Sequence, residues 1–182
     1  MIGAIQPAFQ EQHVKTGFAI RPLTPQDEPF LWEMVYQAIH VPEGMPPPPR
    51  EILQAPGIAH YARRWGLRRG DLGFAAVDEA AGPPVGQPVG AAWLRLFTQR
   101  DPGYGYVDDQ TPELSIALLP EYRGQGLGRL LIEALLDAAA RQFPAVSLSV
   151  SCGNAAKRLY ERLGFVVVAE DDSAQTMLKH LR

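Results

Sequence analysis

The sequence predicts an α/β protein in which strands and helices share one hydrophobic core. Its 182 residues are enough for one globular domain, and 46% of them are hydrophobic, close to the globular average. About seven short segments have the composition of strands, and about four have helical patterns. A glycine-rich loop joins one of these strands directly to a helix.

The first half of the chain predicts three strands and two helical stretches. Residues 1–16 have no clear period and are expected to form an N-terminal extension, so a single domain would span 17–182. Thr24 followed by Pro25 is typical of a helix start, and an apolar stripe continues to Ala38. The other expected segments are strands 17–21, 73–77 and 89–97 and a helical stretch over 50–65, kinked at Pro56-Gly57.

The second half predicts four more strands and two helices. Val146, Leu148 and Val150 alternate with serines, which is typical of a half-buried strand. Asn154 is a suitable helix cap, and Gly164 suits the left-handed residue that follows a helix end. The expected strands span 113–119, 145–151, 165–169 and 176–181, and the expected helices span 126–142 and 154–164.

The clearest sign of a ligand is the loop Arg123-Gly124-Gln125-Gly126-Leu127-Gly128 between a strand and a helix. The first turn of a helix has unpaired N–H groups and a partial positive charge, so a diphosphate is a natural ligand for it. A P-loop would need Gly-Lys-Ser/Thr, but Arg129 and Leu130 follow Gly128, and a dinucleotide fingerprint would need a glycine at 129. On the loop alone, a turn without a ligand stays open.

A second motif runs from Asn154 to Phe165 and contains Tyr160 and a Gly-Phe pair. Together with the glycine loop and the preceding segment 114–122, it resembles the GNAT superfamily of N-acetyltransferases. The resemblance implies the GNAT-like acyl-CoA N-acyltransferase fold, an α/β (α+β) fold. This fold is a mixed, twisted central sheet of about seven strands with helices on both faces. It further implies that strands 113–119 and 146–151 splay apart.

The resemblance implies acetyl-CoA as co-substrate and no metal ion. The opened strand edges would leave backbone groups that need a partner, which in this family is the pantetheine arm. Ile116 and Leu118 would offer backbone contacts to that arm, and Asn154 would also contact it. The residues expected to hold the pyrophosphate are Arg123, Gly124, Gln125, Gly126, Leu127, Gly128 and Arg129.

The implied reaction is direct transfer of an acetyl group to a primary amine of a small molecule or peptide. Glu113 is the candidate general base, although some relatives carry a glutamate where Ser149 stands here. The open alternatives are Asp108, Asp109 and a chain of water molecules. Tyr160 would protonate the departing thiolate or donate a hydrogen bond to it, and the backbone N–H of Leu118 would stabilise the oxyanion.

The acceptor site is less determined by the sequence. Aromatic and acidic residues lie in segments that line this site in similar proteins: Trp32, Tyr36, Glu43, Tyr104 and Tyr106. The lone cysteine, Cys152, is expected to be a packing residue rather than a nucleophile. A catalytically weak CoA-binding sensor and an unrelated phosphate-binding α/β protein are the alternative functions.

Charge and termini give broader expectations. The formal net charge of −3 does not indicate a nucleic-acid or membrane partner. One cysteine cannot form an intrachain disulfide, and neither a signal peptide nor a membrane-spanning stretch is evident in the sequence. A cytoplasmic protein is therefore expected, and a homodimer is left open because many relatives are dimers.

Overall fold

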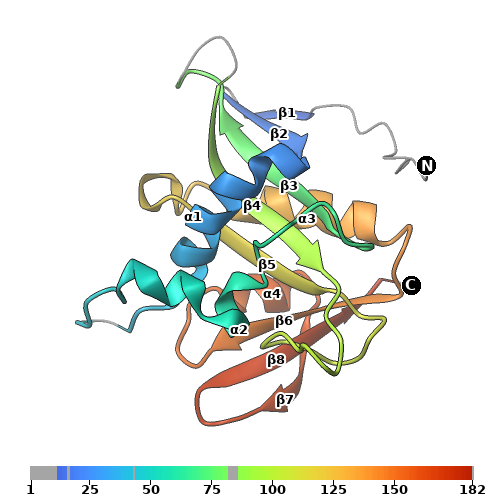
Figure 1. Ribbon diagram of the computed structural model, residues 1–182. Helices are drawn as coiled ribbons and strands as arrows, with labels where there is room; N and C mark the ends of the chain where they lie inside the picture. Colours follow the sequence, from blue (N-terminus) through green and yellow to red (C-terminus); the bar gives the residue numbers. More distant parts are fainter. Residues whose placement is uncertain (1–11, 16, 43, 82–85, 182) are drawn as a thin grey trace.

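The computed structural model describes residues 12–15, 17–42, 44–81 and 86–181 (Figure 1). In these residues it contains one eight-stranded sheet in the order β1-β2-β3-β4-β5-β6-β8-β7. The strands are β1 (Gln12–Lys15), β2 (Phe18–Pro22), β3 (Leu72–Asp78), β4 (Gln87–Arg95), β5 (Glu113–Leu118), β6 (Ala145–Ser151), β7 (Val166–Glu170) and β8 (Ala174–His180).

The sheet is mixed, as predicted. Neighbouring strands are antiparallel except β5 and β6, which run parallel. There is one strand more than the expected number of about seven, because Gln12–Lys15 of the expected extension pairs with β2. The rest of that extension, residues 1–11 and 16, lies outside the described residues.

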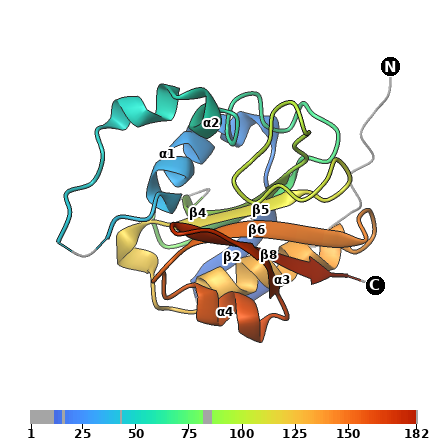
Figure 2. The ribbon, with the colours of Figure 1, turned by 90° about the horizontal axis from the view of Figure 1, so that it is seen from below.

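Helices cover both faces of the sheet, which confirms the predicted layers (Figure 2). One face packs against α1 and α2 around a core that includes Leu31, Trp65 and Trp93. The opposite face packs against α3 and α4, and α3 buries Leu131 and Leu135 there. The helices are α1 (Glu28–Ala38), α2 (Pro56–Ala59), α3 (Leu127–Ala139) and α4 (Lys157–Arg162), with short 3-10 helices at Pro25–Asp27, Arg50–Gln54 and Pro120–Tyr122.

The long helical stretch expected over 50–65 is two short helices followed by turns. Pro56 is the first residue of α2 rather than an interruption within a helix, because that position needs no backbone donor. α1 likewise follows a separate 3-10 turn, in which the Thr24 N–H donates to Asp27 Oδ2 at 2.8 Å. Helix α4 begins three residues after Asn154 rather than at it.

The parallel strands β5 and β6 diverge, as the family resemblance implied. They share a single register pair, Glu113 with Ser147, and the Ser147 N–H donates to the Pro112 carbonyl at 3.0 Å. Beyond that point β5 stays paired with β4 up to Leu118, whereas β6 pairs with β8. A wedge-shaped gap therefore opens in the middle of the sheet, beside the glycine loop.

In the described part of the chain, no helix is long and apolar enough to traverse a lipid bilayer.

Candidate active site

The gap between β5 and β6 continues into a cavity of about 830 Å³. Its walls come from both halves of the chain, namely α1, the proline-rich segment 46–49, α2, β5, β6 and the start of α4. Seven of the predicted site residues line it: Glu113, Ile116, Leu118, Arg123, Gly128, Asn154 and Tyr160. The other predicted residues, Gly124, Gln125, Gly126, Leu127 and Arg129, belong to the glycine loop and the start of α3, outside the lining of this cavity.

The backbone of β5 faces the gap at the predicted positions. The Leu119 N–H donates to the Val89 carbonyl at 2.9 Å, on the β4 side. Peptide groups alternate in direction along a strand, so those of Ile116 and Leu118 point toward β6. The Leu118 carbonyl accepts a hydrogen bond from Arg123 Nε at 3.1 Å, which leaves the Leu118 N–H directed into the gap.

The glycine loop has the backbone shape that the sequence predicted for an anion-binding turn. Gly124 and Gly126 have φ values of 74° and 85°, in the left-handed region that favours glycine. Gly126 is the N-cap of α3, a helix of 13 residues. Leu127 is buried in the core, so its side chain packs while its backbone belongs to the loop. Arg129 Nε donates to Glu133 at 2.7 Å from a largely exposed position.

Arg123 connects the glycine loop to helix α1. Its Nη2 donates to Gln37 Oε1 at 2.9 Å, and the Gln37 amide donates to Glu33 at 2.9 Å. Glu33 also forms a 2.7 Å ion pair with Arg50, whose guanidinium lies 4.5 Å from the centre of the Tyr36 ring. The cofactor loop and the α1 face of the cavity are therefore joined by continuous polar contacts.

Glu113 is the buried carboxylate of the cavity. It is 4% exposed, its Oε1 accepts from the Tyr61 hydroxyl at 2.7 Å, and its Oε2 has no hydrogen-bond partner among the described residues. Burial raises the pKa of Glu113 to about 7, against the opposing effects of the Tyr61 hydroxyl and the Gly105 backbone N–H. A carboxylate with a pKa near neutrality is suited to accept a proton.

Tyr61 was missed by sequence reasoning. It lies 52 residues from Glu113 in sequence, in a segment rich in aromatic and basic residues, and its pattern does not separate it from an ordinary core residue. In the fold its hydroxyl donates to Glu113 and accepts from the Tyr104 N–H at 2.7 Å. Burial raises the pKa of this hydroxyl above its usual value, and the neighbouring Glu113 adds to the effect. The Tyr61 hydroxyl therefore stays protonated at neutral pH and holds the Glu113 carboxylate by donating a hydrogen bond to it.

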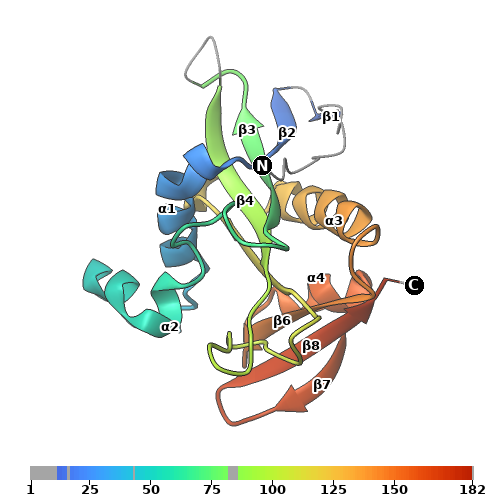
Figure 3. The same ribbon diagram turned by 45° about the vertical axis from the view of Figure 1, so that its right-hand side comes forward.

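The loop 96–112 lies on the α1 and α2 side of the sheet (Figures 2 and 3) and approaches the same carboxylate. A Cβ atom on Gly103 would collide with Glu113 Oε2. A Cβ atom on Gly105 would lie 2.7 Å from the Ser149 backbone nitrogen. Glycine is required at both positions because the loop backbone approaches β5 and β6 so closely.

A buried ion pair positions the segment that carries Tyr61. Arg95 and Asp71 make a bidentate contact with distances of 3.1 and 2.9 Å, and both side chains are 1% exposed. Arg95 Nη1 also donates to the carbonyls of His60 and Arg63, at 2.5 and 2.8 Å. These contacts fix the backbone on either side of Tyr61. The Trp93 indole N–H adds a 3.1 Å bond to the Tyr61 carbonyl.

Tyr160 lies on the opposite side of the cavity. It is 8% exposed, packs edge-on against Phe165 at 6.1 Å and has no hydroxyl hydrogen bond within the described residues. Burial raises the pKa of Tyr160 to about 12, so it remains a proton or hydrogen-bond donor at neutral pH. Asn154 Oδ1 accepts from the Ala156 N–H at 2.9 Å, so it shapes the turn before α4.

The alternative bases lie elsewhere. Asp108 accepts from two backbone N–H groups of its own loop, those of Gln110 and Thr111. Asp109 accepts from the Tyr106 hydroxyl at 2.6 Å, a bond that lowers the pKa of Asp109. Neither aspartate lines the cavity. Both aspartates therefore organise the loop, outside the lining of the cavity.

Of the predicted acceptor residues, some line the cavity and others do not. Tyr36 and Tyr104 line the cavity, whereas Trp32 and Tyr106 do not. Glu43 lies outside the described residues. Cys152 is exposed instead of packed, because it lies beyond the end of β6. The described residues contain no group of three or more His, Cys, Asp or Glu side chains that could hold a metal ion.

Comparison with known proteins identifies this arrangement. The family model for the acetyltransferase (GNAT) family matches residues 32–165, most of the chain. The chain belongs to the GNAT family. The matched region contains most of α1, both diverging strands, the glycine loop and Tyr160. The comparison with curated proteins found no match.

Solved GNAT structures have the same fold. The Salmonella typhimurium protein yncA, solved with its cofactor acetyl-CoA, is similar with a TM-score of 0.62 and 22% identity, over 91% of this chain and 95% of that one. The ribosomal-protein-S18-alanine N-acetyltransferase of Escherichia coli gives 0.58 and 22%, over 90% and 94%. The spermidine/spermine N-acetyltransferase SpeG of Vibrio cholerae gives 0.57 and 20%, over 92% and 95%. At identities of 20–22%, these similarities support a shared fold.

Proposed function

We propose that this GNAT protein is an N-acetyltransferase that moves an acetyl group from acetyl-CoA directly to a primary amine. One observation carries the proposal. The buried carboxylate of Glu113, with its pKa near 7, lies in the same cavity as the opened edge of β5 and the hydroxyl-bearing Tyr160. These are a proton acceptor, a backbone edge for the thioester and a donor for the leaving group.

The chain fits acetyl-CoA on two counts. Beyond Glu113, the Leu118 N–H points into the gap between β5 and β6, where a pantetheine arm would lie. Ile116 and Asn154 line the same cavity. A Cβ atom on Gly124 would meet nothing within 4 Å, so space for a pyrophosphate lies over the left-handed loop. Arg123, Gly124, Gln125, Gly126, Leu127, Gly128 and Arg129 would hold that group. Acetyl-CoA supplies the activated acetyl thioester.

Each protein group then has a defined role in the transfer. Glu113 accepts a proton from the attacking amine, directly or through water; a free alkylammonium has a pKa of about 10.4, so a base is needed at neutral pH. Attack of the amine nitrogen on the thioester carbonyl would form the C–N bond and a tetrahedral oxyanion, to which the Leu118 N–H would donate. Collapse of this oxyanion would break the C–S bond, and the sulfur would leave as the thiolate of CoA. Tyr160 donates to the sulfur as negative charge develops there. No covalent protein intermediate is required.

The direct test is thiol release from acetyl-CoA in the presence of amines. Single small amines, polyamines, amino acids and peptides with free N-termini should be compared, with calorimetric binding of acetyl-CoA measured in parallel. Amine-dependent release supports the proposal. Tight binding without release from any acceptor would favour a CoA sensor, and absence of binding would contradict the cofactor assignment.

Tyr160→Phe is expected to lower kcat by about 10–100-fold while changing the KM for acetyl-CoA little. The variant keeps the ring that packs on Phe165 and removes the hydroxyl alone. Tyr122→Phe is the matched control, because its hydroxyl bonds Asp78 outside the cavity. Equal kcat values for the two variants would remove Tyr160 from the mechanism.

Gly126→Trp is expected to weaken acetyl-CoA binding at least tenfold, because the indole would occupy the space above the loop. A non-glycine residue at the φ of 85° also costs about 1–2 kcal/mol of stability. Gly17→Trp controls for that cost, since Gly17 has a φ of 97° with no atom near its Cβ position. Calorimetry should show normal affinity in Gly17→Trp. Normal affinity in Gly126→Trp as well would contradict the loop assignment.

A further inference from the structure

The acceptor side of the cavity is mainly aromatic and aliphatic. It lies on the face covered by α1 and α2, where Glu113 points. Its lining includes the aromatic residues Tyr61 and Tyr104 and the aliphatic residues Val35, Ile52 and Ile58, with Tyr36, Gln37 and His40 beside them. A substrate body held here would meet more apolar than polar side chains.

Charged groups are scarce in the same wall. Among the described residues that line the cavity, Glu113 is the only carboxylate. It is buried and faces Tyr61, so it can serve one amino group. A second ammonium on the substrate would lose its hydration without gaining a counter-charge, which is unfavourable. In the described part of this wall, Glu113 therefore offers a counter-charge to one ammonium group.

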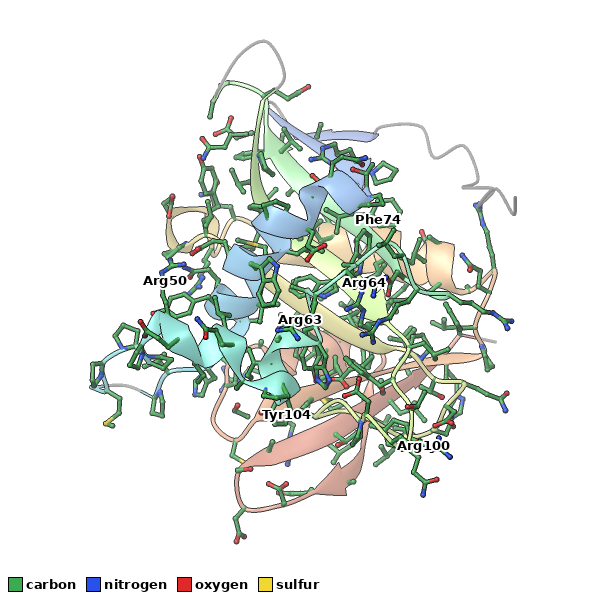
Figure 4. All side chains as sticks on the ribbon, viewed as in Figure 1. Arg50, Arg63, Arg64, Phe74, Arg100 and Tyr104 are labelled. Carbon is green, nitrogen blue, oxygen red and sulfur yellow. The ribbon has the colours of Figure 1, made fainter. Side chains whose placement is uncertain are left out.

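Two stacked rings connect the mouth of the cavity to the carboxylate. The ring centroids of Tyr61 and Tyr104 are 6.2 Å apart, and the two ring planes are nearly parallel, with an angle of 7° between them. The Tyr61 hydroxyl bonds Glu113 and accepts from the Tyr104 N–H, which fixes the second ring relative to the first. Tyr104 is 65% exposed and lies beside the end of α2, where a Cβ atom on Gly57 would be 3.9 Å from its hydroxyl (Figure 4).

A large aromatic residue with so much exposed surface, held by its backbone at the mouth of a cavity, is suited to pack against a flat ligand. We infer that the acceptor is a primary amine with one positive charge on an aromatic, otherwise apolar body. Its ring packs against Tyr104, and its amino group reaches Glu113. This inference rests on the proposed acetyl transfer, because it assigns the substrate class of the same site.

The first test compares three acceptors with the wild-type protein and acetyl-CoA: 2-phenylethylamine, spermidine and a short peptide with an N-terminal alanine. We expect kcat/KM for 2-phenylethylamine to exceed that for spermidine and for the peptide by about tenfold or more. A higher kcat/KM for spermidine or for the peptide would overturn the inference and leave acetyl transfer intact.

The second test uses Tyr104→Ala with Val107→Ala as control. Both residues lie on the same loop and are exposed, but Val107 does not line the cavity. Tyr104→Ala should lower kcat/KM for 2-phenylethylamine by about five- to tenfold and leave the KM for acetyl-CoA unchanged. The Val107→Ala variant should match the wild type. Equal effects of the two substitutions would overturn the role of Tyr104.

A binding measurement separates this inference from the proposed reaction. Calorimetry or ligand-observed NMR should detect 2-phenylethylamine, at an affinity that falls in Tyr104→Ala, and weaker or no binding of spermidine. Binding of the aromatic amine without turnover would contradict acetyl transfer and retain the acceptor class. Absence of such binding, with turnover of another amine, would do the reverse.

Discussion

Glu113→Gln is expected to lower kcat/KM for amine acetylation by about 10²–10⁴-fold, the range typical of a lost general base. Glutamine has nearly the same shape and can still accept from the Tyr61 hydroxyl, which lies 2.7 Å from Oε1. It cannot take up a proton at neutral pH. Wild-type turnover should rise as pH passes through about 7, the pKa that burial gives Glu113, and the variant should lack this step.

The exposed Glu170, at the end of β7, provides the control. Glu170→Gln should keep the wild-type rate and pH profile. If Glu113→Gln retained more than about a tenth of wild-type kcat/KM, proton transfer would have to proceed through water without this carboxylate.

The same substitution is expected to raise stability above neutral pH. The folded-state pKa of Glu113, about 7, lies above the ordinary 4.5, so the folded protein binds more protons than the unfolded chain between these values. The resulting stability is fully present below pH 4.5 and is lost as pH rises through 7, by about 3 kcal/mol. The Glu113→Gln variant lacks this dependence.

Denaturant unfolding of both proteins at about pH 4 and pH 8 isolates this contribution. The free energy of unfolding of the variant minus that of the wild type should be larger at pH 8 than at pH 4, by about 2–3 kcal/mol. A difference that does not change with pH would show that the carboxylate ionises freely in the folded protein. Gain of stability with loss of turnover would identify Glu113 as a residue kept for chemistry.

Arg95→Met is expected to lower the free energy of unfolding by about 3–5 kcal/mol, because it leaves Asp71 charged and buried without its partner. The side chains of this pair are 1% exposed, and Arg95 also serves the carbonyls of His60 and Arg63. Loss of these bonds frees the segment that places Tyr61 on Glu113. Activity should therefore fall even under conditions in which the variant is folded.

Two companion variants test this explanation by denaturant unfolding. Arg129→Met removes an exposed i,i+4 ion pair and should cost less than about 1 kcal/mol. The double variant Arg95→Met with Asp71→Asn should be more stable than Arg95→Met alone, because the unpaired charge is gone. A cost below about 1 kcal/mol for Arg95→Met would mean that water compensates the pair.

Short-range patterns predicted much of the fold. Strands 113–119 and 145–151 are observed within one residue of their expected ends, and α3 lies within the expected 126–142. Apolar alternation and glycine placement are local signals, and they survive in the folded protein. The stretch 50–65 was predicted as a kinked helix because its pattern is helical. It forms two short helices followed by turns, whose carbonyls at His60 and Tyr61 accept bonds from Arg95 and Trp93.

The sequence by itself determined the glycine loop and the order of strand, loop and helix, because each is recognisable within a dozen residues. The resemblance to the GNAT superfamily added the candidates Glu113 and Tyr160. The tertiary structure alone decided that Tyr61 and Gly103 meet Glu113 and that Asp108 and Asp109 stay outside the lining of the cavity. These contacts join residues far apart in the chain. Their positions follow from the packing of the whole sheet, and the burial that raises the pKa of Glu113 exists only in the folded protein.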